Sequence, residues 1–251
     1  MEIISQTVEA MTLPFTISLV TRDKVSSKDL LERVSQDILS ALGEIEQKFS
    51  AFRATSLVSR FQKGDETVML DPEFQEIFAR VTIAKTETRG AFDPYFQGVY
   101  NPTGLVKGWA VEKVFQQYLK PLLRLSEIEA VCLNGGGDMQ FETRDNSSFI
   151  WKIGIENPDH LQEMIARFQM KTGALATSGY SKRGRHILSQ STIKQVTILD
   201  ASLVQADIWA TAALVLSESD FCQMIADKKL SGLYVTNTKK QFFQYGELKN
   251  V

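Results

Sequence analysis

The sequence contains few of the residues on which metal-binding and redox proteins depend. It has two cysteines, Cys132 and Cys222, and two histidines, His160 and His186. The cysteines fall in different predicted elements and lack the spacing of a zinc site, so we expect free thiols in a reducing compartment. The spacing supports neither a Cys-His pair nor a Ser-His-Asp triad, so it indicates neither kind of nucleophile.

Long apolar runs and strong charge are also missing. The longest apolar run lies around residues 210–216, and it is much shorter than the roughly 18 residues of a membrane-spanning helix. The N-terminal segment carries Glu2 and Glu9 and lacks the basic-then-apolar order of a signal peptide. The formal net charge of −2 is too small to gather nucleic acid or an anionic membrane. We therefore expect a cytoplasmic protein with no nucleic-acid partner and no stable membrane insertion.

Common phosphate-binding fingerprints are absent too. No Gly-x-Gly-x-x-Gly segment occurs in the chain. Residues 179–186 repeat the glycine spacing of a Walker loop, but Arg185-His186 stands where that loop requires Lys followed by Ser or Thr. These absences exclude a P-loop enzyme.

The periodicity of apolar residues predicts helices and strands that mix without strict βαβ alternation. An apolar stripe from Leu31 through Phe49 to Phe52 predicts a long helix, and Asp71-Pro72 predicts the start of a second. No repeat or linker divides the chain, so we predict a single α+β domain over residues 1–251, with mixed sheets and packed helices. Strands are expected at 13–20, 130–133, 139–142, 149–155, 174–179, 196–199, 233–235 and 242–245, and further helices at 204–216 and 220–228.

Residues 91–114 combine two proline turns with a lysine between glycines. Asp93-Pro94 and Asn101-Pro102 predict turns, and the segment from Gly104 through Lys107 opens a helical pattern. Free N–H groups and the helix dipole favour an anion at such a helix N-terminus, and the lysine adds positive charge. An ordinary loop-to-helix connection with a surface lysine would have the same pattern.

Asp207 and Thr211 lie four residues apart in a predicted helix that is otherwise apolar. This spacing places both oxygens on one face of the helix, one turn apart. A carboxylate and a hydroxyl are hard ligands, suited to Mg²⁺ and unsuited to zinc. The alternative is structural: Asp207 is then an acid in the first turn near Ser202, and Thr211 bonds back to its own helix.

Two further segments carry polar groups beside glycines or basic residues. The glycines of Asn134-Gly-Gly-Gly-Asp138 permit close approach of the main chain to a ligand, although a tight turn without a ligand would have the same sequence. His186 follows Lys182, Arg183 and Arg185. A lone histidine is commonly structural or solvated, but beside cations and hydroxyls it could contact a pyrophosphate or transfer a proton.

Five segments occur in a recognisable order along the chain. They are Ala91-Phe92-Asp93, Gly104-Leu-Val-Lys107-Gly-Trp-Ala, Asn134-Gly-Gly-Gly-Asp138, Ala176-Thr-Ser-Gly179 ahead of His186-Ile187, and Ala206-Asp207-x-x-Ala-Thr211. In this order they resemble the FAD:protein FMN transferases, the ApbE-like family, over about Ser50 to Leu216. The resemblance implies an ApbE-like (T-fold-like) architecture. It also implies an enzyme that binds FAD with Mg²⁺ and transfers FMN onto a Thr or Ser hydroxyl of an acceptor flavoprotein, with release of AMP.

The resemblance implies a role for each residue at a motif position. Metal ligands fall on Asp207, Thr211 and the main-chain carbonyl of Gly104. Lys107, Asp207 and His186 are expected to act in catalysis. The expected cofactor-binding residues are Met11, Phe52, Ala91, Phe92, Asp93, Asn101, Lys107, Asn134, Asp138, Ser178 and His186.

The chain departs from the family pattern in several places. Met11 is followed directly by Thr12 where the family has Met-Gly-Thr, Asn101 replaces an Asp, and Arg185 replaces a second histidine. Residues 188–193 read Leu-Ser-Gln-Ser-Thr-Ile in place of the family's Asp-Pro-x-Thr-Gly, and the segment before the lysine motif is short. FAD binding tolerates these changes more readily than transfer does. Two alternatives therefore stay open: a non-catalytic FAD-binding protein, or a hydrolase that converts FAD to FMN and AMP.

Overall fold

The computed structural model describes residues 1–179 and 191–249. Its strands are β1 (Glu2–Ala10), β2 (Leu13–Thr21), β3 (Ile128–Gly135), β4 (Asp138–Thr143), β5 (Trp151–Glu156), β6 (Met164–Met170), β7 (Gly173–Gly179), β8 (Ile193–Asp200), β9 (Ser231–Thr236), β10 (Lys240–Gln244) and β11 (Glu247–Lys249). Its helices are α1 (Lys24–Phe49), α2 (Leu57–Gln62), α3 (Pro72–Glu87), α4 (Thr103–Val114), α5 (Leu203–Ala213) and α6 (Glu218–Lys228). Short 3₁₀ segments at Glu66–Leu70 and Lys120–Arg124 and a π turn at Phe115–Leu119 complete the helical structure described.

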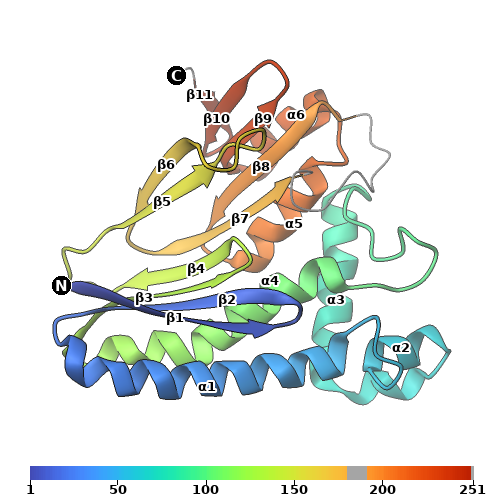
Figure 1. Ribbon diagram of the computed structural model, residues 1–251. Helices are drawn as coiled ribbons and strands as arrows, with labels where there is room; N and C mark the ends of the chain where they lie inside the picture. The colour runs from blue at the N-terminus through green and yellow to red at the C-terminus, as the bar shows by residue number, and fades with distance from the viewer. Residues whose placement is uncertain (180–190, 250–251) are drawn as a thin grey trace.

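One large antiparallel sheet organises the molecule. Its strand order is β1-β2-β3-β4-β7-β8-β9-β10-β11, while β5 and β6 form a separate antiparallel pair. Helices α1, α4 and α5 pack on one face of the large sheet, and the β5–β6 pair lies over the other (Figure 1). Two hydrophobic clusters result, one on each face. The predicted α+β class is confirmed.

Helix α1 shows how local sequence sets an element's ends. The Asp23 side chain accepts hydrogen bonds from the Val25 and Ser26 amides and so caps the N-terminus. Phe49 ends both the helix and its buried stripe, because Ser50 takes an extended conformation. Phe52, which was expected to continue the stripe, lies beyond the helix, and 91% of its surface is exposed.

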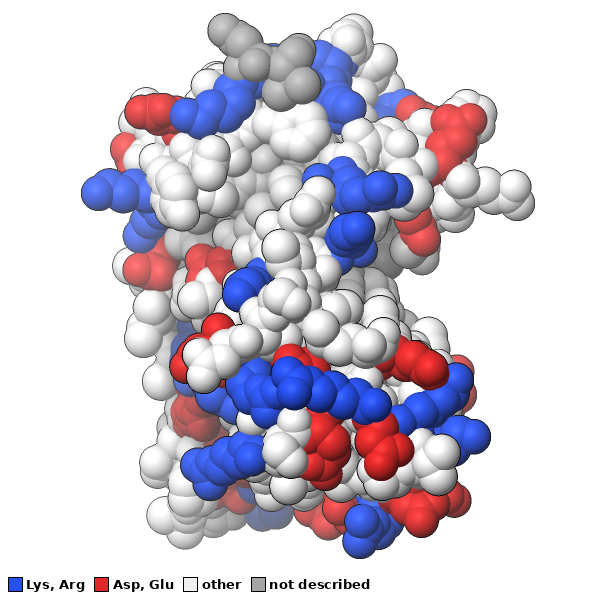
Figure 2. Space-filling model, turned by 90° about the vertical axis from the view of Figure 1, so that its left-hand side faces the viewer, with Lys and Arg blue, Asp and Glu red and all other residues white. Residues whose placement is uncertain are grey.

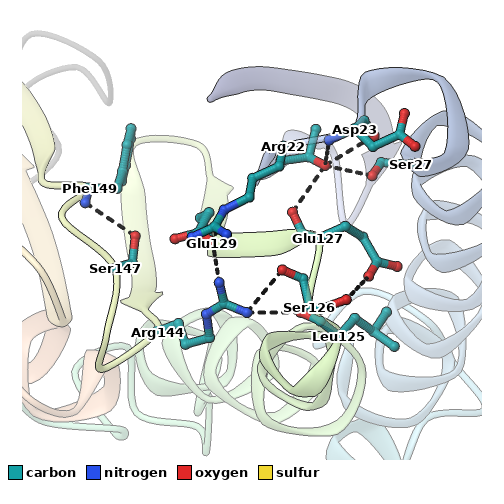
Figure 3. A network of polar contacts seen from close by, with 11 residues as sticks. Arg22, Asp23, Ser27, Leu125, Ser126, Glu127, Glu129, Arg144, Ser147 and Phe149 are labelled. Carbon is teal, nitrogen blue, oxygen red and sulfur yellow. Dashed lines mark hydrogen bonds and ion pairs between the residues drawn. The ribbon is translucent and has the colours of Figure 1, made fainter.

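A buried carboxylate holds the first residues of β3 to its neighbours. The Glu129 side chain is fully buried and forms ion pairs with Arg22, at 2.7 Å, and with Arg144 (Figure 3). Arg144 also donates to the carbonyls of Leu125, at 3.3 Å, and Ser126, at 3.1 Å. We call Glu129, Arg22 and Arg144 the Glu129 clamp. It joins the end of β2, the start of β3 and the residue after β4.

The described surface carries charges of both signs. Lys and Arg side chains are interspersed with Asp and Glu on the face drawn in Figure 2. No described helix combines the length and the apolar character needed to cross a bilayer. Cys132 and Cys222 are free thiols, as predicted, and burial raises the pKa of the Cys132 thiol to about 12.

Candidate active site

Helix α4 carries Lys107 into the protein interior. The Asn101 side-chain oxygen accepts from the Thr103 amide at 3.1 Å and from its hydroxyl at 2.6 Å, and this turn begins the helix. Lys107 follows one turn later, and its side chain is only 12% exposed. Lys107 is therefore not the surface lysine that an ordinary loop-to-helix connection would carry.

Lys107 lies between two buried carboxylates from different elements. Its Nζ forms an ion pair with Asp138 at the start of β4 and is 3.9 Å from Oδ2 of Asp207 on α5. Asp138 is also held by the Thr177 amide, which donates to its Oδ1 at 3.1 Å. We call Lys107, Asp138 and Asp207 the lysine site. These three charged side chains have low exposure, and electrostatic interactions are strong in such a region.

Asp207 and Thr211 take up the predicted arrangement on α5. Ser202 caps this helix, so Asp207 lies beyond the first turn, against α4. The close approach depends on Gly108, because a β-carbon there would be 3.2 Å from Oδ2 of Asp207. The Thr211 hydroxyl lies 3.5 Å from the Ser178 hydroxyl on β7. Both predicted metal-binding side chains therefore face neighbouring elements of the site.

A pocket of about 280 Å³ opens beside Lys107. The β3–β4 turn forms one wall, where the Gly137 amide donates to the Asn134 side chain at 2.8 Å. Gly136 and Gly137 both have positive φ, of 63° and 104°, which glycine adopts without strain. The pocket is lined by Leu13, Lys107, Asn134, Gly136, Gly137, Met139, Ile153, Gly154, Ile155, Glu156, Leu175, Thr177, Gly179 and Gln195.

Phe92 and Asp93 lie near the start of α4, outside that pocket lining. Phe92 is buried and packs on Gly104, where a β-carbon would be 3.3 Å from its ring. Gly104 is one turn before Gly108 and so shares its side of α4. Asp93 pairs with Lys85 at 2.9 Å. Burial raises the pKa of Asp93, but hydrogen bonds from Lys85 and the Tyr95 amide outweigh this and leave the pKa below its usual value.

The other predicted residues are more scattered. Ala91, which is partly buried, follows α3 and immediately precedes Phe92. Met11 is in the β1–β2 turn, where its φ of 51° is unusual for a residue with a side chain. Its amide donates to Glu46 on α1 at 3.3 Å. Phe52 is exposed, as described above, and His186 lies outside the described residues.

Sequence reasoning missed one wall of the pocket. Gln195 on β8 is 5% exposed, and its side-chain amide donates to the Glu156 carbonyl at 3.0 Å. Residues 153–156 of β5 line the same wall. A glutamine beside the apolar residues of a strand is a signal for such a contact, but only the sheet register identifies its partner.

The described donors of the site are oxygen atoms. Across residues 1–179 and 191–249, no three His, Cys, Asp or Glu side chains converge as a metal cluster. Two buried carboxylates and nearby hydroxyls do meet, and the described part of the site adds neither sulfur nor imidazole. Magnesium uses one or two carboxylates, with waters and substrate phosphates as its other ligands. The described residues therefore fit Mg²⁺ in the company of an anionic substrate better than they fit zinc.

A second hollow, of about 900 Å³, lies at the opposite ends of β7 and β8. Its lining includes Phe168, Asp200, Phe242 and Tyr245. Asp200 accepts a hydrogen bond from the Ser202 amide at 3.0 Å and so helps to start α5. None of the residues predicted for the site lines this hollow, so the lysine site is the candidate.

Comparisons with known proteins point to one family. A family model described as "ApbE family" matches residues 11–103 and 101–234. A curated FAD:protein FMN transferase of Vibrio cholerae serotype O1 is 27% identical over 158 residues, which are 56% of this chain and 46% of that protein. The chain thus spans about half the length of the curated relative it matches.

Solved structures share the fold at low sequence identity. The flavin transferase ApbE from Vibrio cholerae matches with a TM-score of 0.74 at 17% identity, covering 95% of this chain and 96% of that one. The apo flavinyl transferase ApbE of Pseudomonas stutzeri gives 0.72 at 19% identity, over 95% and 92% of the two chains. The ApbE protein of Thermotoga maritima gives 0.76 at 17% identity, over 99% and 97%. The predicted ApbE-like architecture is confirmed.

Proposed function

This chain belongs to the ApbE family, and from that premise we propose that it is a Mg²⁺-dependent FAD:protein FMN transferase. The name of the curated Vibrio cholerae relative supports this activity. The substrate is FAD, the acceptor is a Thr or Ser hydroxyl of a flavoprotein, and the second product is AMP. The observation that carries the proposal is the lysine site, where Lys107 lies between Asp138 and Asp207 beside a glycine-walled pocket.

The reaction forms one phosphoester bond and breaks one phosphoanhydride bond. The acceptor hydroxyl oxygen attacks the phosphorus of the FMN half, and the oxygen that links the two phosphates leaves with AMP. The hydroxyl proton must be removed, and we assign its removal to His186. Such transfers depend mainly on positioning and on stabilising charge, because the protein need not form a covalent intermediate.

Asp207, Thr211 and the Gly104 carbonyl are the proposed Mg²⁺ ligands. When bound, Mg²⁺ would neutralise negative charge on the pyrophosphate and on the departing phosphate. The fit rests on the hard oxygen donors of the lysine site. Because Mg²⁺ takes substrate phosphates as ligands beside protein carboxylates, metal and FAD should bind together.

Lys107 and the N-terminal end of α4 supply the positive charge of the protein itself. Lys107 is proposed to stabilise the pyrophosphate oxygens as the bond to AMP breaks. Asp138 orients Lys107 and is in turn positioned by the Thr177 amide. The residues proposed to position the cofactor are Asn134 in the pocket lining and, outside it, Ser178, Phe92, Asp93, Asn101, Met11, Phe52 and Ala91. The pocket of about 280 Å³ accommodates a part of FAD.

The experiment uses the purified protein with FAD, Mg²⁺ and a library of ten-residue peptides that each carry one Thr. We expect some peptides to gain the mass of FMN and to become fluorescent, with an equal amount of AMP released. Removing Mg²⁺ with a chelator should stop both. Equal FMN and AMP with no adduct would identify the hydrolase. FAD that binds and stays intact would identify the non-catalytic alternative, and either result would overturn the transferase assignment.

A further inference from the structure

We propose that the acceptor protein docks as an extended strand on the free edge of β5, beside the lysine site. This inference rests on the proposed transferase function and names how its protein substrate is held. Strand β6 is the partner of β5 within residues 1–179 and 191–249, and β5 joins no other described strand. Among the described residues, the opposite edge of β5 therefore pairs with no strand, which is the arrangement that recognition by β-strand addition uses.

The pocket lining shows which way this edge faces. Side chains alternate between the two faces of a strand, so a pocket on one face contacts every second residue. Here four consecutive residues, Ile153 to Glu156, line the pocket that also contains Lys107. Ile153 and Ile155 are buried toward the large sheet, while Gly154 and Glu156 are not. Contact with all four means that the main-chain edge of β5 borders the pocket.

One hydrogen bond identifies the main-chain groups on this edge. The Gln195 side chain, itself in the pocket lining, donates to the Glu156 carbonyl at 3.0 Å. In a regular strand the N–H and C=O of alternate residues point to the same side. The register of the β5–β6 pair shifts between Ile155 and Glu156. The extra, unpaired residue belongs to β6, so the backbone of β5 stays regular. Gly154 and Lys152 therefore present their N–H and C=O groups toward the same side as Glu156.

The surface beside this edge is polar and open. Ile4 and Val8 of β1 face α1, so Ser5 and Thr7 face the other way, toward the side that β5 covers. Paired hydroxyls continue this row, from Ser5 to Ser18 at 2.8 Å and from Thr7 to Thr16 at 2.9 Å.

Thr16 is in register with Asn134, which lines the pocket. A floor of small hydroxyl side chains therefore leads from the sheet edge to the lysine site. Such a floor leaves room for a polypeptide and satisfies its polar groups.

This arrangement suits an extended acceptor better than a folded one. A strand added to β5 would hold its main chain by hydrogen bonds that do not depend on sequence, while one side chain would point toward Lys107. A Thr or Ser at that position brings its hydroxyl to the cofactor. The site would then select acceptors by local extended structure and by the position of the hydroxyl.

The test removes main-chain donors from the acceptor and from β5. The best peptide from the Thr library is synthesised with single N-methyl groups at successive positions. We expect methylation at alternate positions to raise the KM for the peptide roughly tenfold, the effect of one or two lost hydrogen bonds, and methylation between them to have little effect. Lys152→Pro, which removes an N–H from the free edge, should raise the same KM about tenfold, with the matched control Lys152→Ala within about twofold.

The KM for FAD and the thermal unfolding midpoint should stay unchanged in both Lys152 variants. A uniform response to N-methylation, or an equal effect of Lys152→Pro and Lys152→Ala, would overturn the docking mode while transfer itself continues. Release of AMP without modification of any peptide would also overturn it, and would point to the hydrolase. Intact FAD under all conditions would refute the transferase function as well.

Discussion

The two ends of β3 hold charged clusters of opposite balance. At its start, the Glu129 clamp surrounds one buried carboxylate with two guanidinium groups, and Arg144 is also bound to main-chain carbonyls. Just beyond its end, the lysine site places one ammonium group between two carboxylates, next to a pocket. The two clusters use similar residue types in opposite numbers, and they differ in what they face.

This difference separates a structural role from a chemical one. In the clamp, the excess positive charge belongs to arginines that are partly exposed, so water solvates this charge and no additional anion is needed to balance it. In the lysine site, the ammonium group and both carboxylates lie next to a pocket, so a divalent cation and an anionic substrate that enter it meet groups of opposite charge. The clamp should therefore control stability, and the lysine site should control turnover.

Asp207→Ala is expected to have the largest effect. It removes a proposed metal ligand, so FMN transfer and AMP release should fall by roughly 100-fold or more. The fold should remain, since the large sheet and both hydrophobic clusters do not depend on this side chain. Turnover and thermal unfolding are measured together, with Glu129→Gln as the matched carboxylate replacement in the clamp. Turnover that survives Asp207→Ala would remove this residue from the active site.

Glu129→Gln should lower the stability of the fold and leave turnover unchanged, the reverse of what is expected for Asp207→Ala. Losing the charged contacts of the clamp should lower the free energy of unfolding by about 2 kcal/mol at pH 7, while turnover of the folded protein stays the same. Burial raises the pKa of Glu129, but Ser147 and the guanidinium groups of Arg144 and Arg22 outweigh it and lower the pKa below the ordinary 4.5.

Because the folded-state pKa is depressed, this stabilisation is present above pH 4.5 and is lost as the pH falls through the folded-state value. Urea unfolding of both proteins should therefore show a difference in stability that shrinks below pH 4.5. A difference that stays constant as the pH is lowered would show that ionisation of Glu129 is not what stabilises the clamp.

Lys107→Met tests how the ammonium group affects metal binding. Removing this positive charge beside Asp138 and Asp207 removes a repulsion, so Mn²⁺, used as a probe for Mg²⁺, should bind at least roughly tenfold more tightly in the absence of FAD. Transfer should fall at the same time because the pyrophosphate loses a cationic contact. Arg144→Met in the clamp serves as the control and should leave Mn²⁺ affinity unchanged. Unchanged or weaker Mn²⁺ binding by Lys107→Met would contradict the charge argument.

Gly108→Ala is the smallest perturbation and separates stability from activity within one site. A β-carbon there would be 3.2 Å from Oδ2 and 3.3 Å from Cβ of Asp207, so the carboxylate must shift by a few tenths of an ångström. We expect a roughly threefold to tenfold loss of turnover and a higher Mg²⁺ requirement. Alanine favours the helix by up to about 1 kcal/mol, so stability should hold or rise slightly. Full activity in this variant would show that the Asp207 position is not critical.

The sequence predicted the contributors to the lysine site because they lie in local motifs. The fold brings four elements together, with Lys107 in α4, Asp138 in β4, Ser178 in β7, and Asp207 and Thr211 in α5. The order of their motifs resembles that of the ApbE-like family, and this resemblance predicted that they share one site. The fold class followed from apolar periodicity, and most predicted strands and helices are present within a few residues of their expected bounds.

What the sequence did not reveal depends on long-range register. Strand β1 was not predicted, because its turn with β2 uses Met11 and Thr12 at positive φ in place of the usual glycine or asparagine. Strand β6 lacks a clean alternation of buried and exposed residues. Gln195 and the β5 wall meet only through the packing of two sheets. Phe52 was expected in the core stripe, but the helix ends before it.

The central claim is that one divalent cation binds at the lysine site together with the pyrophosphate of FAD. The most direct measurement is a crystal structure of the protein with FAD and Mn²⁺, read from the anomalous signal of the metal. The account predicts an anomalous peak in contact with Asp207 and Thr211 and with the FAD phosphates, near Lys107. A peak elsewhere, with FAD bound away from Lys107, would contradict it.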